Sequence, residues 1–280
     1  MSLIRLGFWA ASGAGGGGFG YFSRGGETTA VYKFAFPSDS VSTSTSVPAA
    51  TDDNAGFANV AVAGYFSRGL YQFEVYKFAF PTDSVSTTTS APLQLYRHSG
   101  FSNNAVAGYF SRGDNTSNVY KWSFPSDSVS TTSSAPTGMN FHAGFADPAV
   151  AGYFSRGDST TTVYKFAFPS DSVSTTSSTP AAMQIHTGFA DPAVAGYFSR
   201  ASGTDTIYKF AFPSDSVSTT TSSPANTGGQ GGFANPGVAG YLSKSNISTN
   251  VYKFAFPSDS VSSTTSVPAT MNNNAGFADA

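Results

Sequence analysis

The sequence contains no cysteine, so it can form no disulfide framework, no cysteine-ligated metal site and no catalytic thiol. Charged residues make up only 11% of the chain, and the net charge of −2 gives no basic surplus of the kind that nucleic-acid binding requires. Leucine is rare and no helical heptad pattern appears, which argues against a helical bundle. No apolar run approaches the roughly 20 residues of a membrane-spanning helix. We therefore expect no nucleic-acid partner and no membrane span.

Most of the aromatic residues fall in a tandem repeat with a period of 44 residues. The motif Gly-Tyr-Phe-Ser-Arg, or Gly-Tyr-Leu-Ser-Lys in its last copy, begins at Gly20, Gly64, Gly108, Gly152, Gly196 and Gly240. A Val-Tyr-Lys-Phe-Ala-Phe-Pro block and a Gly-Phe-Ala or Gly-Phe-Ser block repeat with the same period. Six units account for residues 17–280, and the array ends in phase with its own beginning. An array that ends in phase indicates a closed ring rather than an open solenoid.

Each unit contains four short segments that read as β-strands. In the Val-Tyr-Lys block the aromatic residues fall on one face of a strand, and valine, lysine and alanine fall on the other. The Ser/Thr run after each Pro-Ser-Asp turn is rich in β-branched threonine. Four strands in about 44 residues, repeated radially, predict an all-β fold: a six-bladed β-propeller with four-stranded blades. We expect two parts, an apolar arm with a glycine-rich tether at residues 1–16 and the propeller at residues 17–280.

Ring closure needs an inner strand to complete the first blade, and two segments compete for that place. The segment Gly276–Ala278 has the correct spacing to pair with the strand near Phe19–Ser23. Residues 7–10 (Gly-Phe-Trp-Ala) also look like an inner strand. We predict closure by the C-terminal strand, because its spacing is in register with the other five units.

The order of the elements resembles kelch repeats. The Ala-Gly-Tyr-Phe-Ser-Arg-Gly block stands where kelch has its apolar strand ending in a double glycine, and Val-Tyr-Lys-Phe-Ala-Phe stands where kelch has its next strand. The segment 186–190 (His-Thr-Gly-Phe-Ala) stands at the kelch innermost strand. The resemblance covers residues 17–280 and implies a kelch-like propeller.

Residues that recur in every unit are expected to hold the scaffold. One arginine or lysine, one lysine and one aspartate recur per unit, and we interpret them as paired or turn-capping charges. The alternative is six equivalent ligand sites, as in propeller lectins. A further column is expected to form a polar ring between the blades: Asn54, His98, His142, His186, Gln230 and Asn274. A metal site at its three histidines is the alternative, although no acidic ligand accompanies them; we predict no metal and no cofactor.

Seven aromatic residues lie outside the repeat columns, and four of them fall in the loops of two adjacent units: Tyr71, Phe73, Tyr96 and Phe141. We expect these loops to emerge on one face, opposite the uniform Pro-Ser-Asp and Asx turns. Exposed aromatics with an arginine are typical of binding surfaces. The predicted binding residues are Leu70, Tyr71, Phe73, Tyr96, Arg97 and Phe141. The alternative is that these side chains only cover loop edges.

The sequence lacks the motifs of the common enzymes. It contains no phosphate-binding loop and no Gly-x-Ser-x-Gly elbow, and its acidic residues outside the repeat columns are scattered. We predict a non-enzymatic structural and adhesive module. A soluble lectin-like propeller with repeated glycan sites is the alternative.

The N-terminal arm carries apolar residues suited to docking: Leu3, Ile4, Leu6, Phe8 and Trp9. Its apolar stretch is shorter than the hydrophobic region of a signal peptide. Residues 4–13 resemble the start of virion proteins of marine and cyanobacterial bacteriophages, which also carry Gly-Tyr-Phe repeats. The resemblance implies a virion or extracellular location, with other virion or assembly proteins bound through residues 1–16 and a host-surface glycan or protein bound at the loops. A homo-oligomer is also compatible with the sequence.

Overall fold

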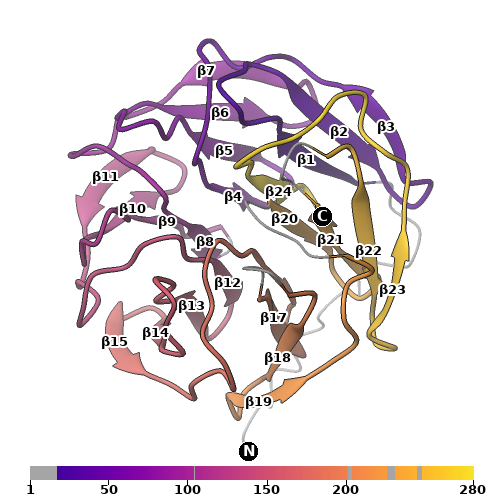
Figure 1. The fold of residues 1–280 in the computed structure, drawn as a ribbon. Coiled ribbons are helices and arrows are strands. Elements are labelled where there is room, and N and C mark those ends of the chain that lie inside the picture. The colour runs from indigo at the N-terminus through magenta and orange to yellow at the C-terminus, as the bar shows by residue number, and fades with distance from the viewer. Residues whose placement is uncertain (1–17, 104, 201–203, 226–230, 245–247) are drawn as a thin grey trace, which may run out of the picture.

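The computed structural model describes residues 18–103, 105–200, 204–225, 231–244 and 248–280. These residues form six four-stranded antiparallel sheets and no helix. The sheets stand as blades around a central axis, which confirms the predicted six-bladed β-propeller (Figure 1). The part of the chain described here contains no helix that is long and apolar enough to cross a membrane.

Every blade is built from an inner, a second, a third and an outer strand, in that order from the axis. Blade 1 comprises β24 (Gly276–Ala278), β1 (Phe19–Ser23), β2 (Val31–Ala35) and β3 (Ser40–Thr43). Blade 2 comprises β4 (Gly56–Asn59), β5 (Ala63–Ser67), β6 (Val75–Ala79) and β7 (Ser84–Thr87). Blade 3 comprises β8 (Gly100–Asn103), β9 (Ala107–Ser111), β10 (Val119–Ser123) and β11 (Ser128–Thr131). Blade 4 comprises β12 (Gly144–Asp147), β13 (Ala151–Ser155), β14 (Val163–Ala167) and β15 (Ser172–Thr175). Blade 5 comprises β16 (Gly188–Asp191), β17 (Ala195–Ser199), β18 (Ile207–Ala211) and β19 (Ser216–Thr219). Blade 6 comprises β20 (Gly232–Asn235), β21 (Ala239–Ser243), β22 (Val251–Ala255) and β23 (Ser260–Ser263).

The C-terminal strand closes the ring, as predicted. β24 pairs with β1, and Phe277 stands opposite Tyr21. Residues 7–10, the alternative closing strand, lie outside the described residues. Blade 1 therefore joins the two ends of the repeat array, and the final interface, between blades 6 and 1, has the same contacts as the other five.

Those contacts are a tyrosine and a lysine of one blade that share an aspartate of the next. In blade 4 the Tyr153 hydroxyl donates to Asp215 at 2.7 Å, and Lys165 Nζ lies 2.7 Å from the same carboxylate. Burial and the aspartate acceptor raise the pKa of Tyr153 well above its usual range. The lysine–aspartate pairs are Lys33–Asp83, Lys77–Asp127, Lys121–Asp171, Lys165–Asp215, Lys209–Asp259 and Lys253–Asp39. The lysine and aspartate columns are therefore paired charges, one of the two roles expected for the charge columns.

The hydrophobic core lies between blades rather than within them. Between blades 4 and 5, for example, the inner-strand residue Phe145 packs against Phe198 and Phe210. The same ring covers Gly196, where an added Cβ would lie 2.0 Å from Phe145 Cε2. The glycine of the Gly-Tyr-Phe motif is therefore required by the close approach of a phenylalanine from the preceding blade, and this explains its recurrence.

The ends of the strands define two faces, which we name by their connections. The loop face carries the loops between second and third strands and the connections between blades, and a bridge such as that between Thr160 and Met183 joins the two kinds of loop. The turn face carries the Pro-Ser-Asp turns and the Asx turns between inner and second strands. The loops that vary in sequence therefore share one face, as expected.

Candidate functional site

The loop between β5 and β6 has an unusual residue pair at its tip. Leu70 and Tyr71 have φ values of 54° and 55°, and the Gln72 amide donates to the Gly69 carbonyl at 2.8 Å across the turn. Two successive residues with positive φ are the mark of a type I′ turn, in which glycine, asparagine and aspartate are strongly preferred. The equivalent turn of blade 3 has Asp114 and Asn115. Blade 2 therefore holds two apolar residues in a strained backbone, and Tyr71 is 44% exposed.

Tyr71 begins a stack of side chains that crosses three blades. Its ring lies 3.9 Å from that of Tyr96, measured between centroids, at an interplanar angle of 22°. The Arg97 guanidinium carbon lies 4.5 Å from the centre of the Tyr96 ring and 4.0 Å from that of Phe141. Tyr96 and Arg97 lie in the connection from blade 2 to blade 3, and Phe141 lies in the connection from blade 3 to blade 4. We call these four residues the aromatic–arginine stack.

An acidic residue lies at the side of this stack. Asp53 Oδ2 is 3.8 Å from Arg97 Nε. Burial raises the pKa of Asp53, the charge of Asp52 raises it further, and Arg97 and Tyr96 oppose this shift. Burial also raises the pKa of Tyr96 to about 12, with a contribution from Asp53. The stack and Asp53 together therefore place aromatic surface, one cation and one carboxylate in a small area.

The residues at the mouth of the central channel on the loop face share one backbone conformation. Asp53, Arg97, Phe141, Ile185 and Asn273 are equivalent positions of different repeats, and their φ values lie between 43° and 51°. Positive φ is expected for Asp and Asn but is a strained choice for Arg, Phe and above all the β-branched Ile. These residues line a cavity of about 50 Å³ at the channel mouth.

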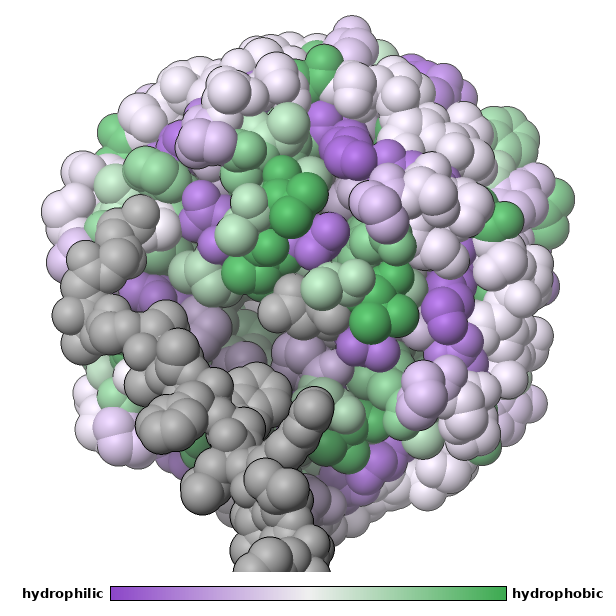
Figure 2. Space-filling view, turned by 180° about the vertical axis from the view of Figure 1, so that it is seen from behind, coloured by the Kyte–Doolittle hydropathy of each residue, from purple (hydrophilic) through white to green (hydrophobic). Residues whose placement is uncertain are grey.

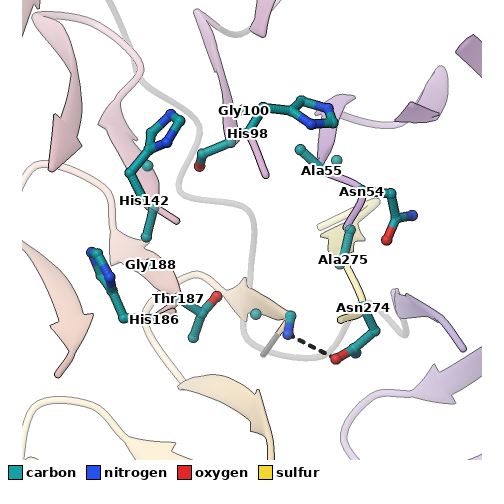
Figure 3. A pocket seen from close by; sticks show the side chains of 17 residues that line it. Asn54, Ala55, His98, Gly100, His142, His186, Thr187, Gly188, Asn274 and Ala275 are labelled. Carbon is teal, nitrogen blue, oxygen red and sulfur yellow. Dashed lines mark hydrogen bonds between the residues drawn. The ribbon is translucent and has the colours of Figure 1, made fainter. Parts of the chain in front are cut away.

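The predicted polar ring lies next to this mouth (Figure 3). Its three histidines are buried, and each Nε2 meets the hydroxyl of a serine in the preceding blade, at 2.6 Å for Ser67 and His98. The equivalent pairs are Ser111–His142 and Ser155–His186, at 2.5 Å each. Asn54 and Asn274 bond the equivalent serines, Ser23 and Ser243. Gln230 lies outside the described residues.

The histidines are held in the neutral state. Burial lowers the pKa of His98, His142 and His186 to about 3 each. Among the described residues, no group of three His, Cys, Asp or Glu side chains is arranged to hold a metal ion. What they form is a set of hydrogen bonds between neighbouring blades.

The structure brings together four of the six predicted binding residues, in the aromatic–arginine stack. Leu70 precedes Tyr71 in the same turn and is half-buried, and Phe73 is 40% exposed further along the loop. No ring contact joins Phe73 to the stack within the described ranges. The predicted docking residues Leu3, Ile4, Leu6, Phe8 and Trp9 lie outside those ranges. Sequence reasoning missed Asp53, Ile185 and Asn273 at the mouth; the signal was available, since the residue at this repeat position differs in every unit.

The fold places the chain in the class of six-bladed β-propellers, and the comparisons with known proteins agree. The solved structure of YjhT matches with a TM-score of 0.66 over 82% of this chain and 88% of that chain, at 11% sequence identity. At this identity the likeness concerns the fold alone. The profile of a domain of unknown function (DUF5648) matches residues 125–243. No curated protein matches the sequence.

Proposed function

We propose that this protein is a non-catalytic binding propeller that holds a protein partner on its loop face. The observation that carries the proposal is the aromatic–arginine stack, which breaks the six-fold repetition and is built on strained backbone at Tyr71, Arg97 and Phe141. Strain of this kind persists where the surrounding structure imposes it, and it clusters at functional sites. Tyrosine and arginine are also the residue types enriched among the dominant contacts of protein interfaces.

The shape of the site favours a protein over a small ligand. The cavity at the channel mouth has a volume of about 50 Å³, whereas small-molecule sites usually measure roughly 300–1,000 Å³. Both faces of the Tyr96 ring are covered, by Tyr71 and by Arg97, so this ring offers a sugar only its edge. Three large apolar side chains are exposed in the β5–β6 loop and in the connection that follows blade 2: Tyr71, Phe73 and Leu93. A broad surface with an apolar centre fits a protein partner.

The virion, or another extracellular assembly, remains the proposed setting. It rests on the resemblance of residues 4–13 to virion proteins. No observation favours repeated glycan sites, because the repeated charges are engaged within the fold. The lysines and aspartates pair across blades, and arginine Nε atoms donate to backbone carbonyls, as Arg156 does to Gly138 at 3.3 Å.

Site-specific photo-crosslinking tests the proposal. A benzoylphenylalanine placed at position 71 should crosslink to one protein of the assembly or of its host. The same probe at Ser159, the equivalent position of blade 4, should not crosslink to that protein. Arg97→Ala should abolish the capture, because loss of a dominant interface residue costs about 2 kcal/mol or more. We also expect Tyr71→Ala with Tyr96→Ala to leave the fold intact while weakening binding.

Three results would contradict this function. Equal capture from positions 71 and 159 would show that the stack has no special role. Binding to a glycan array that persists in the Tyr71→Ala, Tyr96→Ala variant would instead support the lectin-like alternative. Loss of folding in that variant, seen by circular dichroism, would show that the rings belong to the core.

A further inference from the structure

The other end of the central channel, on the turn face, is apolar. It opens into a cavity of about 160 Å³ lined by inner-strand residues and by the turns that follow them, among them Phe101, Ala190, Pro192 and Ala280. Five valines in the same turns are 40–50% exposed: Val62, Val106, Val150, Val194 and Val238. Figure 2 shows hydrophobic side chains gathered around a central hollow. An apolar mouth with a ring of exposed valines is unusual on a monomeric surface and indicates that something covers it.

The sixth position of the valine ring is Gly18, where the N-terminal segment joins the propeller. Gly18 lies at the mouth itself, because a Cβ added to it would lie 3.0 Å from Ala280 Cβ and 2.9 Å from Asp279 Oδ1. The Gly18 carbonyl also accepts a hydrogen bond from the Phe36 amide at 2.9 Å, which fixes its position. The 17 residues that precede it therefore start at the rim of the apolar cavity.

We propose that residues 3–9 of the same chain cover this mouth, with an aromatic side chain of the segment in the cavity. The segment has the required chemistry, since Leu3, Ile4, Leu6, Phe8 and Trp9 are apolar and Arg5 is its only charged residue. A cavity of about 150 Å³ accommodates a benzene-sized group, so the opening suits one aromatic ring. The proposal concerns the turn face and is independent of the function proposed for the loop face.

The tether has the right length for an intramolecular contact. Nine peptide steps separate Trp9 from Gly18. Within this stretch, every residue of the run 13–18 is glycine or alanine. A flexible glycine-rich chain of this length has a root-mean-square span of about 16 Å and a maximum of about 30 Å. A short flexible tether gives an effective concentration in the millimolar range, so at ordinary protein concentrations the segment of the same chain outcompetes that of a second copy.

Tryptophan fluorescence provides the test, because the chain has only two tryptophans. Trp122 is buried in β10 at a position where the other five blades have phenylalanine, so Trp122→Phe removes it conservatively and leaves Trp9 as the sole reporter. We expect Trp9 to emit at short wavelength and to be protected severalfold from acrylamide quenching, at all protein concentrations. Emission typical of a solvent-exposed indole would overturn the proposal.

A charge in the cavity should then release the segment. Ala190→Glu, in the Trp122→Phe background, should shift the Trp9 emission to longer wavelength and remove the protection. The column tolerates a polar residue, since the equivalent position in blade 3 is Ser102. Thr175→Glu, on the exposed outer strand β15, is the matched control and should change neither property. Protection that survives Ala190→Glu would rule out this cavity as the site.

The absence of cysteine allows a second readout that does not depend on fluorescence. The pair Phe8→Cys with Ala190→Cys should form an intramolecular disulfide on mild oxidation, and Phe8→Cys with Ser159→Cys, on the loop face, should not. Two outcomes would overturn the intramolecular proposal and show that a second copy covers the mouth. One is a disulfide between two chains. The other is protection of Trp9 only at concentrations where sedimentation shows a dimer.

Discussion

The two faces of the propeller use sequence in opposite ways. On the turn face most residues recur from blade to blade, and the recurring aspartate has the same structural partners each time, as Asp215 has in Tyr153 and Lys165 of the preceding blade. On the loop face the equivalent positions differ, and several hold side chains on a backbone that does not suit them, as at Tyr71 and Ile185. Residues that are the same in every unit thus form the contacts that hold the blades together. Residues that differ between units lie where those contacts do not require a particular side chain.

The largest expected effect concerns the polar ring near the loop face, where three units have histidine and two have asparagine. The three histidines have a pKa of about 3 when folded and about 6.5 when unfolded. Between these values the unfolded chain binds more protons, so stability is complete above pH 6.5 and falls as the pH is lowered. Each histidine contributes a loss of about 1.4 kcal/mol per pH unit, which gives about 4 kcal/mol for the three at pH 5.5.

Urea unfolding at pH 7.5 and pH 5.5 measures this loss. The protein itself suggests the control substitution, because Asn54 and Asn274 form hydrogen bonds with the serines equivalent to those that contact the histidines. A triple variant with His98→Asn, His142→Asn and His186→Asn should lose most of the pH dependence in this window. If the wild type and the triple variant lose stability equally, the histidines are not the buried neutral groups described here.

The next largest effect on stability concerns the glycine that recurs in the Gly-Tyr-Phe motif of every unit. Gly152→Ala would place a Cβ 2.1 Å from Phe101 Cε2, and that ring is packed against Tyr109 and Phe154 and has no room to move. We expect a loss of about 3 kcal/mol in the free energy of unfolding, as for severe overpacking of a core. Thermal and urea unfolding at pH 7.5 measure it.

Gly237→Ala is the matched control for this glycine. No atom lies within 4 Å of the Cβ that it would add, and although its φ is 71°, Ala61, Ala105 and Ala193 adopt a similar φ at the equivalent position. We expect a change of less than about 1 kcal/mol. A Gly152→Ala variant as stable as Gly237→Ala would mean that the blades can separate enough to relieve the contact.

The sequence alone was sufficient to predict the architecture. The 44-residue period, four strand-like segments per unit and an array that ends in phase led to six blades and to closure by Gly276–Ala278, because a closed ring must match its two ends. The recurrence of the charge columns led to their interpretation as paired or turn-capping charges, and the structure shows that the lysines pair with the aspartates. Each of these features occurs in every repeat unit, so this one sequence contains six copies of the pattern from which each was predicted.

The binding surface was only partly predictable, because its residues occur once. The leftover aromatics pointed to the correct loops, but the sequence could not show that Arg97 lies between Tyr96 and Phe141, or that Phe73 stands apart from them. Nor could it show that Asp53 and Ile185 share a positive φ with Arg97, since backbone strain leaves no mark in a residue that is not glycine, asparagine or aspartate.

The smallest expected change in stability concerns the loop face, whose residues differ between units. Replacing the blade 2 turn by that of blade 3, with Leu70→Asp and Tyr71→Asn, puts residues that tolerate positive φ where they are needed. We expect stability to rise by about 1 kcal/mol, after the loss of the ring contact with Tyr96 is set against the relief of strain at two residues. Capture of the partner from the loop face should be lost in the same variant. The reciprocal exchange, Asp114→Leu with Asn115→Tyr, should lower stability by more than this amount, because Asn140 stands at the position of Tyr96 and offers no ring contact to offset the strain. Urea unfolding measures both changes. A fall in stability on the first exchange would mean that Leu70 and Tyr71 support the fold, and that the irregular residues of the loop face belong to the scaffold after all.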